Sequence, residues 1–119
     1  MKLPLQITLR DIAHSDAVEQ AIREKAGKLD QFHAHIMSCR VTVEIPGKHK
    51  HHGKTFSVRI DITVPGNEIV VNRERDEDIY VVLRDAFDAA KRQLEDYSRR
   101  QRGDVKHHEH PQQDVVAAE

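Results

Sequence analysis

The chain is poor in cysteine and in aromatic residues. Among its 119 residues there is one cysteine, Cys39, no tryptophan, three phenylalanines and two tyrosines. A single cysteine excludes an internal disulfide and suits a reducing compartment. So few aromatic rings exclude a broad platform on which successive single-stranded bases stack. The sequence has neither the apolar segment of a signal peptide nor an apolar run of membrane-spanning length, so we expect a cytoplasmic protein without membrane contact.

The chain also lacks an excess of charge of either sign. Its net charge is −1, although charged residues make up 33% of it and hydrophobic residues 38%. This composition predicts one heavily solvated globular domain with a modest core. Any binding to nucleic acid must therefore depend on where the basic side chains gather, because the total charge gives no attraction.

Recognisable catalytic machinery is missing as well. We find no glycine-rich phosphate loop, nucleophile elbow or spaced pair of acids, so we expect no enzyme activity and no cofactor. Cys39 is in phase with the apolar residues of its strand, which favours a buried, inert thiol over a nucleophile. Histidines gather at His49, His51 and His52 and again at His107, His108 and His110. With no thiolate near them, these clusters are typical of polar loops, and we expect no metal site.

Four segments have the alternating pattern of strands with one buried face. They are residues 3–10, 37–45 and 56–64, and a short segment over 69–71. Pro4 lacks an amide hydrogen, so we expect the first strand to start at, or to lie along, a sheet edge. Pro65 and Gly66 predict a turn between the last two strands.

Two segments have helical spacing. Ser15 has the character of an N-cap for a helix over 15–32, whose apolar face is closed by Phe32. The second helix is predicted over about 77–101, and its stripe consists of Tyr80, Leu83, Phe87, Ala90, Leu94 and Tyr97. Residues 103–119 have no periodicity, which predicts a disordered polar tail after a domain formed by 1–102.

The order of these elements predicts an α+β fold, β-α-β-β-β-α. Each strand has one apolar face, so a four-stranded mixed sheet needs a cover on one side only. Two amphipathic helices packed on that face complete a two-layer sandwich, whose other sheet face is open and polar.

Basic residues concentrate on the two predicted helices. Lys25 projects near the middle of the first apolar stripe, and Lys28 emerges on its flank. On the second helix, Arg84, Lys91 and Arg102 form one row, flanked by Arg92 and Arg99, and Arg100 belongs to the basic segment 99–106. Two explanations stay open: a surface that binds phosphates, or ordinary ion pairs four residues apart on a solvated helix. The candidate pairs are Arg84–Asp88, Asp88–Arg92, Lys91–Glu95 and Glu95–Arg99.

Two segments resemble the ribosome hibernation promoting factor family, also called the ribosome-associated inhibitor or sigma-54 modulation protein family. One is AIREKAGKLDQF, residues 21–32, followed by the strand Arg40-Val-Thr-Val-Glu; the other is DIYVVLRDAFDAAKRQL, residues 78–94. With the order of elements, the resemblance covers about residues 1–102. Lys25 and Lys28 match the family's Lys-x-x-Lys, and Arg92 matches the arginine of its Arg-Gln-Leu. Ala89 stands where the family often has a lysine.

The resemblance implies a short form that acts without a C-terminal dimerisation domain and is monomeric when free. Its partners would be the small ribosomal subunit and its ribosomal RNA, without DNA. It would occupy the decoding channel, where messenger RNA and the A- and P-site transfer RNAs sit, and inactivate ribosomes under stress or in stationary phase. Two alternatives stay open: a modulator of sigma-54-dependent transcription that binds protein, and a free-standing binder of double-stranded RNA.

Overall fold

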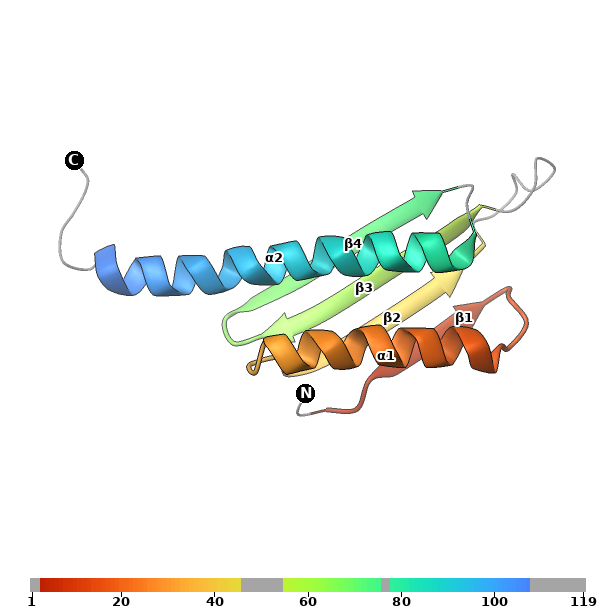
Figure 1. Ribbon diagram of the computed structural model, residues 1–119, viewed down its shortest axis with the longest axis horizontal. Helices are drawn as coiled ribbons and strands as arrows, with labels where there is room; N and C mark the ends of the chain where they lie inside the picture. Colours follow the sequence, from red (N-terminus) through yellow and green to blue (C-terminus); the bar gives the residue numbers. More distant parts are fainter. Residues whose placement is uncertain (1–2, 46–54, 76–77, 108–119) are drawn as a thin grey trace.

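A computed structural model describes residues 3–45, 55–75 and 78–107. The elements follow the order β1 (Gln6–Arg10), α1 (Asp16–Phe32), β2 (Ser38–Glu44), β3 (Phe56–Val64), β4 (Asn67–Arg75) and α2 (Ile79–His107). Both helices lie on one side of a four-stranded sheet and run side by side (Figure 1). The predicted two-layer α+β sandwich is therefore confirmed.

The sheet has the strand order β1-β2-β3-β4, with one parallel pair and two antiparallel pairs. β1 lies at the edge, as Pro4 predicts, and Ile7 of β1 is in register with Val41 of β2. The turn between β3 and β4 has Gly66 at φ 77°, a backbone conformation that glycine adopts without the penalty other residues meet. The last three strands thus form an antiparallel meander, and β1 adds to its edge as a parallel strand.

Local side-chain hydrogen bonds mark the beginnings of both helices. The Ser15 hydroxyl accepts a hydrogen bond from the Val18 amide at 3.2 Å, which confirms the predicted N-cap of α1. The Asp78 carboxylate accepts one from the Tyr80 amide at 2.8 Å in the first turn of α2. In each case a short polar side chain pairs with an amide that has no partner within the helix.

The core lies between the helices and one sheet face. Its largest fully buried side chains are Ile22, Ile36, Ile60, Ile62, Leu83 and Leu94. Among the described residues no polar or charged residue is buried. The charged side chains are therefore distributed over two outer surfaces, that of the helices and that of the open sheet face.

Several elements differ from the sequence-based expectation. β4 spans nine residues where a short strand over 69–71 was expected, because its polar end pairs with β3 as far as Arg75. α2 extends past the expected end near residue 101 to His107, and its last turns project beyond the sheet (Figure 1). The disordered tail was predicted over 103–119, but residues 103–107 belong to α2. Residues 108–119 lie outside the described part of the chain, and their disorder stays a prediction.

Four apolar side chains assigned to the core face are more exposed than expected. The exposed fractions are 69% for Phe32, 60% for Leu3, 43% for Tyr80 and 37% for Met37. Each lies at the end of a helix or beside a strand end, where the opposite layer no longer covers it. The periodicity identifies the apolar face correctly, but the opposite layer of the sandwich ends before the apolar pattern does.

Candidate nucleic-acid interface

A groove between the two helices brings together three of the predicted basic residues. Lys25 and Lys28 enter it from α1, and Lys91 enters it from α2. Lys25 is half-buried, with Leu29 and Phe87 lining the same hollow, whereas Lys28 and Lys91 are exposed. The hollow has a volume of about 190 Å³ and includes one acidic side chain, Asp88. Lysine stems thus pack against apolar groups while their ammonium groups stay accessible to an anion.

An exposed aromatic ring stands at the same place. Phe32 is the last residue of α1, and the Lys91 ammonium lies over its ring, 5.7 Å from the centroid. This distance suits a cation–π contact. The contact joins the two helices at the surface and gives the groove a flat apolar group beside its three cations.

The other predicted site residues lie along α2. Arg84, Arg92 and Arg99 are exposed, with Arg84 on the same row as Lys91. Arg100 is nine residues after Lys91, which at roughly 100° per residue places it about half a turn away from that row. Arg102 lies in the helix backbone, and nothing further about its side chain is described. The basic surface therefore consists of Lys25, Lys28, Arg84, Lys91, Arg92 and Arg99.

The four candidate ion pairs between residues four apart on α2 are not formed within the described residues. Within the described residues none of the four candidate pairs, such as Arg84–Asp88 or Lys91–Glu95, is within salt-bridge distance. Asp85 instead pairs with Arg75 of β4 at 2.7 Å, and Asp96 pairs with Arg99. Most cations of the basic surface consequently have no carboxylate partner among the described residues.

The open sheet face carries a second group of basic side chains, which the sequence did not assign to the site. Arg10, Arg40 and Arg59 surround a hollow of about 500 Å³. Each has a partner. Arg59 pairs with Asp61 at 3.1 Å, Arg10 with Glu44 at 3.7 Å, and the Arg40 guanidinium donates to the Gln6 amide oxygen at 3.0 Å. The hydrogen bond and the charge of Asp61 raise the pKa of Arg59.

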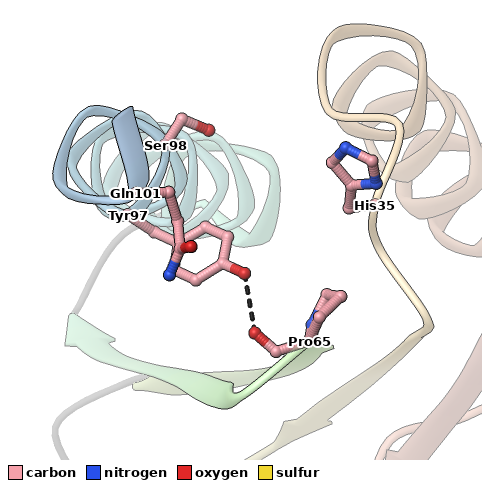
Figure 2. Close-up of a pocket in the computed structure, with 5 residues that line it drawn as sticks. All are labelled: His35, Pro65, Tyr97, Ser98 and Gln101. Carbon is pink, nitrogen blue, oxygen red and sulfur yellow. Dashed lines mark hydrogen bonds between the residues drawn. The ribbon is translucent and has the colours of Figure 1, made fainter. Parts of the chain in front are cut away.

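A third hollow, of about 400 Å³, lies below the C-terminal part of α2 (Figure 2). The Tyr97 hydroxyl donates a hydrogen bond to the Pro65 carbonyl at 2.7 Å, as the dashed line in Figure 2 shows. This bond ties α2 to the β3–β4 turn. The remaining lining residues, His35, Ser98 and Gln101, bring no charge cluster to the hollow.

The residues considered for chemistry and metal binding give no assembled site in the described part of the chain. Cys39 is buried, and burial, assisted by the charges of Asp61 and Asp30, raises the pKa of its thiol to about 12. A thiol with so high a pKa is a poor nucleophile. No group of three metal-ligating side chains occurs among the described residues. The histidine cluster at 49, 51 and 52 falls outside them.

No helix in the described ranges could span a membrane. Neither α1 nor α2 combines the length and the apolar character that crossing a bilayer requires.

Comparisons with known proteins give the fold and the family. The chain is similar to a ribosomal subunit interface protein from Coxiella burnetii, with a TM-score of 0.67 and 19% identity, over 79% of this chain and 96% of that one. Against the N-terminal domain of Protein Y from Thermus thermophilus, the TM-score is 0.65 and the identity 20%, over 82% of this chain and 99% of that one. At these identities the similarity establishes a shared fold.

No curated protein matches the chain in sequence. A family model described as sigma 54 modulation protein / S30EA ribosomal protein matches residues 5–102, the whole two-layer sandwich with the first part of the projecting end of α2. That range includes all eight predicted site residues, from Lys25 to Arg102. The resemblance seen in the sequence is thereby confirmed, and the chain belongs to the sigma 54 modulation protein / S30EA ribosomal protein family.

Proposed function

We propose that this protein associates with the ribosome, binds ribosomal RNA of the small subunit through its helical surface, and inhibits translation by occupying the decoding channel. The observation that carries the proposal is the groove in which Lys25, Lys28 and Lys91 converge. None of these lysines forms an ion pair with a carboxylate among the described residues. The family, and one similar structure that is named as a ribosomal subunit interface protein, support the ribosome as the partner.

The physical basis is electrostatic. Basic side chains that contact phosphates release condensed counterions, so the logarithm of affinity falls linearly with the logarithm of salt concentration. A protein of net charge −1 gains no attraction from its total charge, and the attraction must come from a local surface. Double-helical RNA presents phosphates and 2′-hydroxyls more accessibly than base edges, so a lysine- and arginine-lined surface suits it.

The test is binding to purified small subunits, with two variants matched in charge. Replacing Lys25, Lys28 and Arg92 by glutamine removes three cations from the helical surface, and replacing Arg10, Arg40 and Arg59 by glutamine removes three from the sheet face. We expect the first variant to bind roughly tenfold or more weakly. Its salt slope should fall by about one for each phosphate that is no longer neutralised. The second variant should bind like the wild type in sedimentation with small subunits.

Three further measurements sharpen the mechanism. Messenger RNA and initiator transfer RNA should each compete with the protein, because all three would fill one channel. In a cell-free system, the helical-surface variant should lose inhibition in parallel with binding. Equal binding by both variants, or affinity unchanged by bound messenger RNA, would contradict the proposal. Binding to a sigma factor without RNA, or to any RNA duplex, would favour one of the two alternatives instead.

A further inference from the structure

Phe32 is the most exposed of the large hydrophobic side chains in the described residues. Its exposed fraction is 69%, against 60% for Leu3 and 43% for Tyr80. An aromatic ring contributes to a core by burial, and this one gains little from burial. Its position at the end of α1 is therefore not explained by the packing of the two layers.

The ring shares its hollow with three cations. Phe32 lines the same hollow as Lys25, Lys28 and Lys91, and the Lys91 ammonium lies over the ring at 5.7 Å. The cores of protein–protein interfaces are depleted in lysine, so this setting does not suit a protein partner. A flat apolar group beside several cations matches a nucleotide, which joins a flat ring system to an anionic phosphate.

The size of the hollow limits what it receives. Its volume of about 190 Å³ is smaller than the roughly 300–1,000 Å³ of pockets that hold drug-sized ligands. A hollow of this volume suits a single base better than it suits a stretch of double-helical RNA. Proteins recognise RNA loops, bulges and ends through unstacked bases placed on aromatic rings. With a single exposed ring in the groove, the surface has one stacking position and not a continuous platform.

We propose that Phe32 stacks on one unpaired base of small-subunit ribosomal RNA, while Lys25, Lys28 and Lys91 hold the adjoining phosphates. This inference rests on the proposed function and adds a contact that depends on ring shape and not on charge. Phe32 then favours positions on the RNA where an unpaired base adjoins accessible phosphates, such as loops, bulges and ends.

The experiment compares variants of the full chain on small subunits washed free of messenger RNA and transfer RNA. Phe32→Leu keeps an apolar side chain and removes the aromatic face, and Phe32→Trp keeps that face. Val70→Ala is the matched control, because Val70 is an exposed apolar residue on the opposite sheet face. Thermal unfolding of each variant checks that the fold is unchanged.

We expect Phe32→Leu to weaken binding on the order of tenfold, the loss of one base–aromatic stack. Its salt slope should equal that of the wild type, since every phosphate contact is kept. Phe32→Trp should bind at least as well as the wild type, and Val70→Ala should leave affinity unchanged.

The outcomes separate this inference from the proposed function. Suppose that Phe32→Leu binds with wild-type affinity and that the variant with Lys25, Lys28 and Arg92 replaced binds weakly. The stacking inference would then be wrong, and the proposed function would stand. A flattened salt slope for Phe32→Leu would also overturn the stacking inference, because the ring would then act only by positioning Lys91. If the charge variant binds like the wild type, the proposed function itself fails. Chemical probing of the bound subunit should show one unpaired base protected by the wild type and reactive with Phe32→Leu; identical patterns would count against the inference.

Discussion

The helical surface and the open sheet face both carry basic side chains, but they differ in what those side chains contact. On the sheet face, Arg59 and Arg10 pair with carboxylates, and Arg40 donates to Gln6. On the helical surface, Lys25, Lys28 and Lys91 have no carboxylate partner among the described residues. A paired arginine has part of its attraction already satisfied within the molecule. The comparison teaches that a count of basic residues does not distinguish the two surfaces, whereas the pairing of those residues does.

The largest expected effect concerns the layer that separates these two surfaces. Ile60 is fully buried at the centre of β3, between Val41 of β2 and Val71 of β4. Ile60→Ala should lower the free energy of unfolding by about 2–5 kcal/mol, measured by urea denaturation, because it removes buried methyl groups and leaves a cavity. Val70→Ala, on the other face of the same sheet, should cost about 0.5 kcal/mol or less. Similar losses for both variants would contradict the assignment of the two faces.

An intermediate effect, a loss of stability at high pH, is expected from Cys39. Its side chain faces the helices, whereas that of its neighbour Arg40 faces the open side of the sheet. Burial raises the pKa of the Cys39 thiol from 9.0 to about 12. Between these values the unfolded chain loses the proton and the folded chain keeps it. The contribution of the Cys39 thiol to the free energy of unfolding is therefore fully present below pH 9 and is lost as the pH rises towards 12.

Urea denaturation of the wild type and of Cys39→Ala at about pH 8 and about pH 10.5, on either side of the ordinary thiol pKa, checks this prediction. The wild type should lose more stability than the variant over that interval. At the lower pH the native thiol should resist alkylation and should react once the chain is unfolded. Rapid alkylation of the native protein would show that the layer under the helices opens readily.

The smallest effect is expected on the sheet face. Asp61→Asn keeps the size of the side chain and removes the charge that pairs with Arg59, whose side chain is half exposed; an ion pair with one partner open to solvent contributes little to stability. The melting temperature should therefore stay nearly constant. Freed from its partner, Arg59 should make the protein elute from a heparin column at slightly higher salt than the wild type. An unchanged elution would mean that pairing does not limit anion binding on this face, which would weaken the comparison.

The sequence predicts most of the fold because hydrophobic periodicity is a local signal. Ser15 is predicted as an N-cap and Pro4 as the mark of an edge strand, and the structure confirms both. The length of β4 escapes prediction because its end, from Asn72 to Arg75, is polar and is held by pairing with β3. The length of α2 is not predicted either, because the last turns have no core to face and so no apolar stripe.

The candidate site is predicted only in part. Lys25, Lys28 and Lys91 follow from their helical positions, and the structure places them in one groove. Arg100 is also predicted, yet it lies about half a turn of α2 from Lys91. Phe32 is assigned to the core by the sequence, because its spacing after Leu29 continues the apolar stripe. Only the exposed position of its ring identifies it as part of the surface. RNA binding by these residues stays a prediction.

The sequence by itself determined the order of elements, the buried face of each and the family, because these depend on residue spacing within single segments. Only the tertiary structure decided which cations remain free. Whether Arg59 meets Asp61, or Asp85 meets Arg75 and not a neighbour on its own helix, depends on rotamers and on strand and helix positions. The juxtaposition of Lys91 with Phe32 depends on how α1 and α2 pack across the sheet. The spacing of residues within one segment cannot predict a contact with another segment far away in the chain, and so only the folded chain reveals it.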